Sequence, residues 1–264
     1  MKNLLNKIFS FSKKSSQKYS YFEYLKNKKS TSLLFSAIED YSESSEIRYV
    51  GGCVRKILNN EDVDDIDLAV NLEPKHCIEA IKKKNIKFYE TGVDHGTITA
   101  IIDDNKFEIT SLRKDIITDG RHAKVKFSKN WLEDASRRDF TINCIYSDID
   151  GNLYDPFNGK KDIEKGKVEF IGDIDKRIKE DYLRILRYIR FFLSYSKIEH
   201  DEKVKKIIRQ NINGISNVSS ERLLDELKKI IKSKFFLKLF KDNFSQEIIK
   251  LIFPQLKNFR IFDK

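Results

Sequence analysis

The 264-residue sequence predicts an α+β fold, with a mixed β-sheet in its first part and only helices in its last part. Over residues 31–170, short strand-like segments alternate with helical ones, and the turn Asp103-Asp104-Asn105 indicates a hairpin. From about residue 171 onward, apolar residues recur with the 3.6-residue period of helices. We therefore expect a flexible N-terminal segment over residues 1–30, a sheet-containing domain over 31–170 and a helical domain over 171–264.

The elements of the sheet-containing domain follow from local signals. Pro74 suits the first turn of a helix, because the N–H that proline lacks would have no intrahelical partner there. The expected strands cover residues 47–50, 66–70, 86–89, 97–102, 106–111 and 141–146. The expected helices cover residues 33–41, 54–58 and 74–84.

The helical domain is predicted from apolar stripes. A stripe over residues 177–193 predicts one uninterrupted helix. This stripe consists of Ile178, Leu183, Leu186, Ile189 and Leu193. The run Ser219-Ser220-Glu221 is typical of a helix N-terminus, so a further helix is expected from there to about residue 231.

Asp65 and Asp67 are the most informative acidic residues. They flank Ile66 in an expected strand, where side chains two positions apart share one face. Two close carboxylates repel each other unless a cation lies between them, and oxygen ligands suit Mg²⁺. The alternative is an acidic turn that opens a strand, because so short a motif also occurs by chance. The residues upstream favour the metal site.

Those upstream residues are Gly51, Gly52 and Arg55. Glycines let the backbone approach a phosphate closely, and the N-terminus of the helix expected beside them attracts anions. Arg55 adds a guanidinium fork for a phosphate. Together with the two carboxylates, these residues predict metal-dependent nucleotidyl transfer.

Further candidates lie downstream. Arg137 and Arg138 precede Asp139 in a motif that ends at Asn143. Two arginines are costly to gather without an anion, so they are candidates for clamping a triphosphate. The alternative is an exposed helix end with a weak Arg–Asp pair. Glu108 lies between apolar strand residues, either as a third carboxylate at the metal site or on the solvent face of a hairpin.

The series Glu180, Asp181, Arg184, Arg187 and Arg190 follows helical spacing. Asp181 and Arg184 are three residues apart, so on a helix the aspartate can orient the arginine. Such a pair offers donors and acceptors that match the edge of a nucleobase, and the later arginines extend toward phosphates. Routine surface salt bridging is the alternative interpretation.

Residues 110–129 form a polar segment with Asp119-Gly120-Arg121-His122 at its centre. Its glycine predicts a loop that moves during turnover. Other site classes are disfavoured. Three separated cysteines form no C-x-x-C pair, and four histidines show no H-x-x-x-H spacing, which argues against disulfide frameworks and transition-metal sites. No apolar stretch approaches the roughly 20 residues that cross a bilayer, so no membrane association is expected.

The net charge of +10 is concentrated in the last third of the chain. Residues 173–264 hold 22 Lys and Arg against 13 Asp and Glu, whereas residues 1–172 hold 29 against 28. A basic module with many aromatic residues is typical of a phosphate-rich partner, and a lysine-rich solvated surface is the alternative. The first 22 residues carry five lysines and no acid, which resembles an organellar transit peptide except that arginine is absent. We expect a cytoplasmic protein, with an organellar matrix as the alternative.

Nine motifs occur in an order that resembles bacterial tRNA nucleotidyltransferases. They are GGCVRK, DDIDLAV, HGTITAII, FEITSLRKD, TDGRHAKV, DASRRDFTIN, DPFNGKKDIEKG, EDYLRILRYIRF and SSERLLDELKKI. The order is similar to that of class II CCA-adding enzymes and bacterial poly(A) polymerases. The residues within the motifs are most similar to those of the alphaproteobacterial branch. The resemblance covers about residues 45–233.

The resemblance implies a nucleotidyltransferase head with a mixed sheet, followed by an α-helical neck, body and tail. In this chain we expect residues 171–264 to form the neck and a reduced RNA-binding body. It implies that Asp65 and Asp67 bind two Mg²⁺, and that Asp181 and Arg184 template the incoming base, with Glu180 bracing them. The loop from Asp119 to His122 would switch the enzyme from C to A addition. The implied contacts to CTP or ATP are Gly52, Arg55, Arg138, Arg187 and Arg190.

The expected activity is template-independent addition of C, C and A from CTP and ATP to the tRNA 3′ end. The alternatives are a CC- or A-adding specialist, a poly(A) polymerase, or a non-catalytic RNA-binding protein on the same scaffold. No feature specifies an oligomer, so a monomer is the default expectation. Two departures stand out: Lys56 replaces an aspartate that is frequent in the family, and only 37 residues follow the SERLLDEL element.

Overall fold

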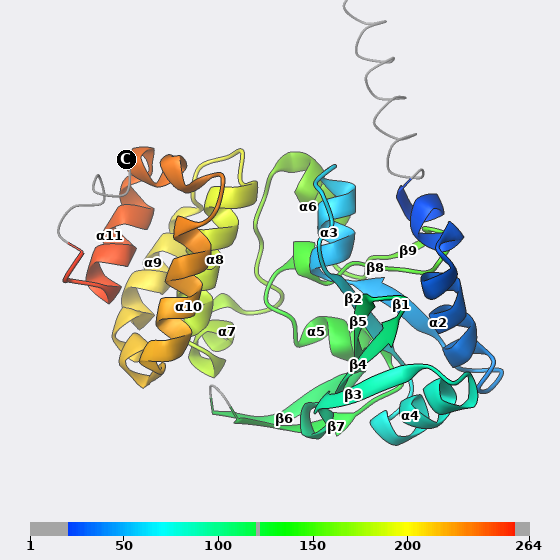
Figure 1. Ribbon diagram of the computed structural model, residues 1–264. Helices are drawn as coiled ribbons and strands as arrows, with labels where there is room; N and C mark the ends of the chain where they lie inside the picture. Colours follow the sequence, from blue (N-terminus) through cyan, green and yellow to red (C-terminus); the bar gives the residue numbers. More distant parts are fainter. Residues whose placement is uncertain (1–20, 120–121, 257–264) are drawn as a thin grey trace, which may run out of the picture. The chain divides into compact units, whose positions relative to one another are not determined.

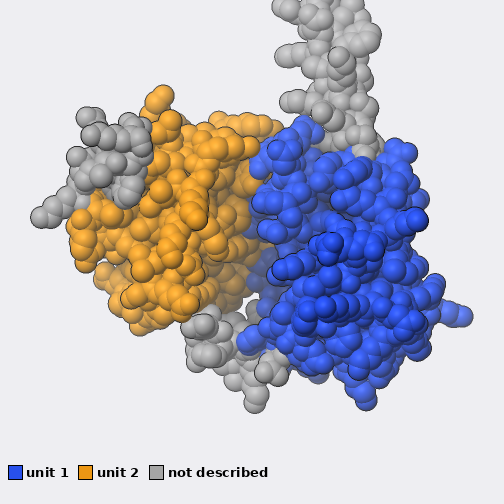
Figure 2. Space-filling view, viewed as in Figure 1, with its two compact units in different colours: residues 1–114, 125–138, 142–160 blue, residues 115–124, 139–141, 161–264 orange. Residues whose placement is uncertain are grey.

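The computed structural model describes residues 21–119 and 122–256. The chain forms two compact units that alternate along the sequence (Figure 2). Unit 1 comprises residues 1–114, 125–138 and 142–160, and unit 2 comprises residues 115–124, 139–141 and 161–264. The last change from unit 1 to unit 2 therefore follows residue 160, earlier than the predicted boundary near residue 170.

Unit 1 contains a seven-stranded sheet in the order β3-β4-β5-β2-β1-β8-β9 (Figure 1). The sheet is mixed, because β2 and β5 run parallel whereas neighbours such as β1 and β2 run antiparallel. Its strands are β1 (Ile47–Val50), β2 (Ile66–Val70), β3 (Lys87–Gly92), β4 (Thr97–Ile102), β5 (Asn105–Ser111), β8 (Tyr146–Ser147) and β9 (Leu153–Tyr154). The predicted α+β class is confirmed. Asp103 and Asp104 have positive φ angles in the turn between β4 and β5, as a tight hairpin requires.

The helices of unit 1 begin where the local sequence provides a cap. Pro74 starts α4, as predicted, and the Asn130 side chain accepts the backbone N–H groups of Leu132 and Glu133 to cap α5. The helices are α2 (Lys29–Glu39), α3 (Gly52–Leu58), α4 (Pro74–Lys83) and α5 (Trp131–Ser136). Short 3₁₀ turns occur at Val93–His95 and Thr141–Asn143.

The N-terminal side of unit 1 is ordered earlier than the sequence predicts. Residues 21–27 are helical, and Phe22 and Leu25 are buried. The Phe22 ring packs against Tyr49, with 5.9 Å between ring centroids, which ties this segment to the core of unit 1. Residues 1–20 of the expected flexible segment lie outside the described residues.

Two further segments differ from the prediction. The expected loop around residue 120 is flanked by β6 (Arg113–Asp119) and β7 (His122–Phe127), which pair as a two-stranded sheet. The strand expected over residues 141–146 is replaced by a 3₁₀ turn before β8. The apolar residues of this run are buried, although their backbone is irregular. Periodicity alone does not distinguish such a buried run from a strand.

Unit 2 is built from helices around an aromatic core. Phe140, Phe170, Tyr188 and Phe191 are buried, and the Phe140 ring meets Phe170 edge-on at 4.8 Å between centroids. The helices of the C-terminal part are α7 (Ile174–Glu180), α8 (Leu183–Tyr195), α9 (Glu202–Asn211), α10 (Ser220–Ile231) and α11 (Asn243–Ile252), preceded by α6 (Gly159–Lys165), with 3₁₀ turns at Ile212–Asn217 and Phe236–Lys241. Ser219 occupies the N-cap position of α10 as predicted, although its side chain makes no capping hydrogen bond.

The prediction of one helix over residues 177–193 is wrong. Helix α7 ends at Glu180, and Asp181 is extended with φ −156° and ψ 102° before α8 begins at Leu183. The Asp181 carboxylate accepts the Leu183 backbone N–H at 3.2 Å, so it satisfies the first N–H group of the second helix. In the described part of the chain, no helix is both long and apolar enough to cross a membrane.

Candidate active site

The carboxylates of the predicted metal site come together in unit 1. Asp67 and Glu108 are register partners on the parallel strands β2 and β5, and Asp65 immediately precedes β2. Leu68 and Val70 are buried below them. Asp67 is half-buried, whereas Asp65 and Glu108 are exposed.

The pKa of Asp67 records this crowding. Burial raises that pKa first, and the negative charges of Glu108 and Asp65 raise it further, against a smaller opposing effect of Arg138 and Arg55. A cation at this place would relieve the repulsion. Mg²⁺ needs only one or two protein carboxylates, because it keeps waters and takes other ligands from phosphates. The oxygen donors therefore fit Mg²⁺, although no group of three His, Cys, Asp or Glu side chains able to hold a metal ion occurs within residues 21–119 and 122–256.

The glycine pair lies between the carboxylate and two arginines. Gly51 has φ +67°, and a Cβ there would lie 3.4 Å from Nη1 of Arg138. A Cβ on Gly52 would lie 3.7 Å from Oδ2 of Asp67 and 3.8 Å from a terminal nitrogen of Arg55. Side chains at these positions would fill the space that a phosphate needs, so the glycines keep it open.

Arg55 is held below this turn. It is 7% exposed, and its guanidinium donates to the side-chain oxygen of Asn143. Asn143 is an uncharged partner, so it orients the guanidinium without neutralising its charge. Lys56 stands where the family frequently has an aspartate. It forms an ion pair with Asp64, which belongs to the acidic run before β2.

Arg137 and Arg138 share a partner that the sequence analysis missed. Nε of Arg137 donates to Oδ1 of Asp134 at 2.8 Å, and Nη2 of Arg138 donates to Oδ2 at 3.0 Å. The arginine side chains are 17% and 19% exposed and that of Asp134 is 2% exposed, which disfavours the alternative of an exposed helix end with a weak pair. The signal was present, because Asp134 precedes the arginines by three and four residues on one helical face.

In unit 2, the expected Asp181–Arg184 side-chain pair does not form, because the chain is not helical at Asp181. Arg184 donates instead to Glu180 at 2.6 Å and to the Arg177 carbonyl oxygen at 2.6 Å. Glu180 thus braces Arg184, as expected. Asp181 is held by Arg222 of α10 at 2.7 Å.

The other two arginines of this series are also paired. Arg187 donates to Asp139 at 2.8 Å and 2.5 Å, and Arg190 donates to Glu226, whose carboxylate is 2% exposed. The Arg190 guanidinium lies 4.2 Å from the centroid of the Phe191 ring. Arg222 and Glu226, which are four residues apart on α10, therefore hold two candidate residues at once; sequence analysis identified neither.

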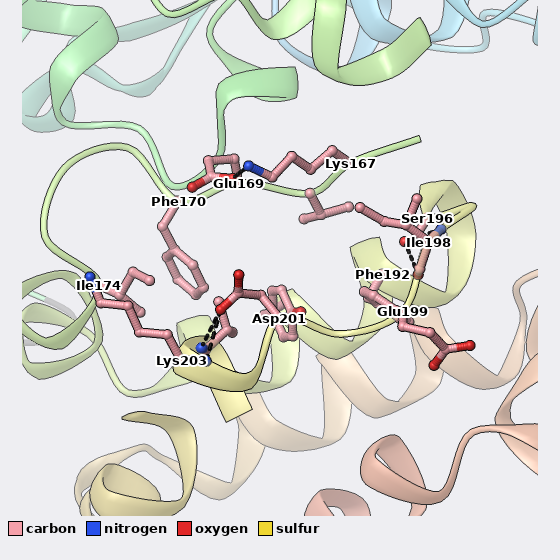
Figure 3. Close-up of a pocket in the computed structure, with 13 residues that line it drawn as sticks. Lys167, Glu169, Phe170, Ile174, Phe192, Ser196, Ile198, Glu199, Asp201 and Lys203 are labelled. Carbon is pink, nitrogen blue, oxygen red and sulfur yellow. Dashed lines mark hydrogen bonds and ion pairs between the residues drawn. The ribbon is translucent and has the colours of Figure 1, made fainter. Parts of the chain in front are cut away.

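The predicted mobile loop is only partly described. The backbones of Asp119 and His122 end β6 and begin β7, and Arg121 lies outside the described residues. A separate hollow of about 110 Å³ occurs in unit 2, with Phe170, Asp201 and Lys203 on its wall (Figure 3). It contains none of the predicted site residues and is smaller than the roughly 300 Å³ of a small ligand pocket, so it is not the nucleotide site.

The predicted residues therefore form two sets. Unit 1 holds Gly51, Gly52, Arg55, Asp65, Asp67, Glu108, Arg137, Arg138 and Asn143. Unit 2 holds Asp139, Glu180, Asp181, Arg184, Arg187 and Arg190. The first set joins carboxylates to cations beside a glycine turn, and the second presents braced arginines and one aspartate.

Known proteins share these sequence features. The family described as "Poly A polymerase head domain" matches residues 47–169, and the family described as "Probable RNA and SrmB- binding site of polymerase A" matches residues 198–260. The mitochondrial CCA tRNA nucleotidyltransferase 1 of Homo sapiens is 45% identical over 195 residues, which are 72% of this chain and 44% of the relative. A CCA-adding enzyme of Lactobacillus johnsonii is 37% identical over 187 residues, 70% of this chain and 46% of the relative. The chain thus spans less than half the length of these curated relatives.

Solved structures share the fold. The CCA-adding enzyme of Bacillus stearothermophilus in complex with CTP aligns with a TM-score of 0.71 at 24% identity, covering 87% of this chain and 59% of that one. A tRNA nucleotidyltransferase complexed with a primer tRNA and an incoming ATP analog aligns with a TM-score of 0.70 at 22% identity, covering 87% and 65%. The motifs, the mixed-sheet head and these relatives together confirm the resemblance, and the chain belongs to the class II CCA-adding enzyme and poly(A) polymerase family.

Proposed function

We propose that this protein is a template-independent nucleotidyltransferase that adds C, C and A from CTP and ATP to the 3′ end of tRNA. The observation that carries the proposal is the set in unit 1, where Asp67 and Glu108 are paired in register beside the Gly51–Gly52 turn and two arginines. Carboxylates and cations at one glycine turn suit a metal-bound triphosphate.

The reaction joins the RNA 3′-hydroxyl to the α-phosphate and releases pyrophosphate. Asp65 and Asp67 would hold Mg²⁺, two ions in the proposal, which supplies charge neutralisation at the reacting phosphate. Arg55 and Arg138 bind the outer phosphates, and their fixed positions lower the cost of orienting the triphosphate. Catalysis of this kind rests on positioning and electrostatics rather than on covalent participation of the protein.

Unit 2 supplies base selection in this proposal. Arg184 and Asp181 offer donors and an acceptor whose positions are fixed by Glu180 and Arg222. Such groups discriminate bases through hydrogen bonds to their edges. The basic surface of the same region would bind tRNA phosphates, which agrees with the RNA-binding family matched at residues 198–260.

The decisive experiment supplies tRNA that lacks its terminal CCA together with CTP alone, ATP alone or both. Full activity adds two residues with CTP alone and three with both nucleotides, as read on a sequencing gel. A product that stops after CC, or a single A on a CC-ended tRNA, identifies a specialist. No incorporation in Mg²⁺ with an intact, tRNA-binding protein identifies the non-catalytic alternative.

Poly(A) synthesis is the second candidate, because the matched family is described as a poly(A) polymerase head. The same assay separates the two activities. A poly(A) polymerase extends tRNA and unrelated RNA with ATP alone into long products, whereas a CCA-adding enzyme stops after one A.

A further inference from the structure

We propose that Asp134 is the positioning residue of the triphosphate site, and that it fixes Arg138 and Arg137 for phosphate binding without touching the nucleotide. This inference rests on the proposed function, because it assigns a role within the same site. The evidence lies in three features of unit 1: the division of the Asp134 oxygens, the edge of Arg138 that faces Gly51, and the ionised state of Asp134.

Asp134 divides its two oxygens between the arginines. Oδ1 accepts from Nε of Arg137 at 2.8 Å, and Oδ2 accepts from Nη2 of Arg138 at 3.0 Å. The Tyr146 hydroxyl donates to Oδ2 at 2.7 Å and accepts from Nε of Arg138 at 3.1 Å. One buried carboxylate and one phenol thus fix the orientation of two guanidinium groups.

This arrangement sets which edge of Arg138 faces the glycine turn. A guanidinium has five N–H donors in a rigid plane, and Asp134 and Tyr146 bind the edge formed by Nε and Nη2. Nη1 then donates to the Asn143 carbonyl oxygen at 3.4 Å and lies 3.4 Å from the position of a Cβ on Gly51. The edge directed at the turn is therefore the one that would meet a phosphate.

The charges in the cluster keep Asp134 ionised. Two guanidinium groups share its single carboxylate. Burial alone would raise the pKa of Asp134, but the two arginines and the Tyr146 hydroxyl outweigh it and hold that pKa below its ordinary value. Asp134 therefore remains ionised at neutral pH and can orient both guanidinium groups.

The test compares Asp134→Asn with the wild type in binding of CTP, UTP and inorganic tripolyphosphate, all in Mg²⁺ and without tRNA. Asparagine keeps the shape but removes the charge that orients the arginines. We expect all three affinities to fall by a similar factor of about tenfold, and the KM values for CTP and ATP to rise together. The CTP-to-UTP affinity ratio should stay unchanged, because base selection belongs to other residues.

Glu133→Gln is the matched control. Glu133 directly precedes Asp134 on α5, but it binds Ser128 and Lys114 rather than the arginines. It should leave all three affinities unchanged. Tyr146→Phe is the second variant, and it removes only the hydroxyl that both Asp134 and Arg138 contact. It should produce a smaller loss with the same pattern, and it decides the matter if Asp134→Asn does not fold.

Wild-type affinity for tripolyphosphate in folded Asp134→Asn, or in Tyr146→Phe where Asp134→Asn does not fold, would overturn the inference. So would a changed CTP-to-UTP ratio with unchanged tripolyphosphate binding, because it would assign Asp134 to the base. Failure of the wild type to bind CTP counts against the proposed function itself. The two failures are therefore distinguishable.

Discussion

At the residue scale, buried Asp134 and half-buried Asp67 of unit 1 have opposite electrostatic situations. Asp134 has arginine partners that lower its pKa, whereas Asp67 has a raised pKa because burial and neighbouring carboxylates outweigh the cations. A group that favours the protonated form in the folded state destabilises that state at neutral pH. Functional sites commonly retain such destabilising groups, and a bound divalent cation would remove the repulsion at Asp67.

Asp67→Asn should abolish addition of both C and A, with a fall in rate of roughly a thousandfold or more, while tRNA affinity persists. The asparagine removes the proposed metal ligand and also the repulsion that raises the Asp67 pKa. Stability without Mg²⁺ should therefore be equal or greater, and the increase in melting temperature on adding Mg²⁺ should disappear. Asp62→Asn, an exposed neighbour, is the control. Near wild-type turnover of the Asp67 variant in Mg²⁺ would contradict the metal assignment.

Arg184→Ala should impair the choice of nucleotide more than the rate at saturating CTP and ATP. Arg184 is 9% exposed and is held by Glu180 and the Arg177 carbonyl, so its remaining donors are fixed in direction. We expect misincorporation of UTP to increase about tenfold, as for loss of one bidentate base contact. Arg209→Ala, which breaks an exposed pair with Glu247, should not alter fidelity. Unchanged fidelity in the Arg184 variant would make this residue structural.

At the element scale, the break between α7 and α8 organises the second set. Asp181 leaves the helical conformation, satisfies the first N–H group of α8 and receives Arg222 from α10. Helix α10 also binds Arg190 through Glu226. Arg222 and Glu226, four residues apart on one face of α10, therefore support Asp181 and Arg190. This explains why Glu226 is buried and Arg222 is half-buried, although both are charged.

Replacing Asp119-Gly120-Arg121-His122 with a Gly/Ser linker of equal length should stop the reaction after CC. The reason is the expected role of this connection between β6 and β7 in switching to A addition. Product sizing on a gel gives the answer, with CTP incorporation as the internal control. Complete CCA ends from this variant would show that the switch lies elsewhere.

A second element-scale prediction concerns the acid stability of unit 2. His200 links α8 to α11, with Nδ1 2.9 Å from the Tyr188 hydroxyl and Nε2 2.8 Å from Asp242. Burial alone would raise the pKa of Asp242, but hydrogen bonds from His200 and Ser245 outweigh it and lower that pKa. The ionised carboxylate therefore stabilises the fold above its unfolded pKa of about 3.9, and this contribution is lost as the pH falls through the lower folded value.

Asp242→Asn should accordingly reduce the free energy of unfolding at pH 7 by about 1–3 kcal/mol, and the difference from the wild type should shrink as the pH falls below about 4. Urea denaturation at pH 7, 5 and 3 measures it. Asp225→Asn on the exposed face of α10 is the control. A stability difference that stays constant down to pH 3 would mean that the shape of the Asp242 side chain, and not its charge, stabilises the fold.

At the whole-molecule scale, charge separates along the sequence. Residues 173–264 hold 22 Lys and Arg against 13 Asp and Glu, whereas residues 1–172 are nearly balanced at 29 against 28. Arg209 and Lys205 are paired with Glu247 and Glu202, so not every basic residue contributes equally to a positive surface. The candidates for tRNA contact are Lys203, Lys205, Lys206, Arg209, Lys228, Lys229, Lys232, Lys234 and Lys238.

Neutralising four exposed lysines, Lys203, Lys206, Lys232 and Lys234, should weaken tRNA binding and flatten its salt dependence. Each lost phosphate contact should reduce the slope of log K against log salt by about one. CTP affinity should not change. The matched control neutralises four exposed lysines of unit 1, namely Lys75, Lys82, Lys87 and Lys106. An unmoved affinity and slope would place the RNA grip on a second subunit or a partner protein.

The sequence predicted most of the sheet and the starts of α4 and α10, because strand alternation, Pro74, Ser219 and the Asp103–Asp104 turn are local signals. It also predicted that Asp67 and Glu108 are candidates, but not that they are register partners, since strand order depends on contacts distant in sequence. Apolar periodicity continues through Asp181, so it did not reveal the break between α7 and α8. The Asp181 carboxylate binds the Leu183 N–H and the Arg222 guanidinium, and these contacts override local helix propensity.

What the sequence determined by itself was the fold class, the family and the identity of the residues available for chemistry, because these depend on residue type, spacing and order. Only the tertiary structure decided how each charge is satisfied. Arg187 pairs with Asp139, which is 48 residues away in the sequence, and α10 supports Asp181 and Arg190. Ion pairs depend on which helices and strands pack together, and that packing minimises buried unpaired charge across the whole unit.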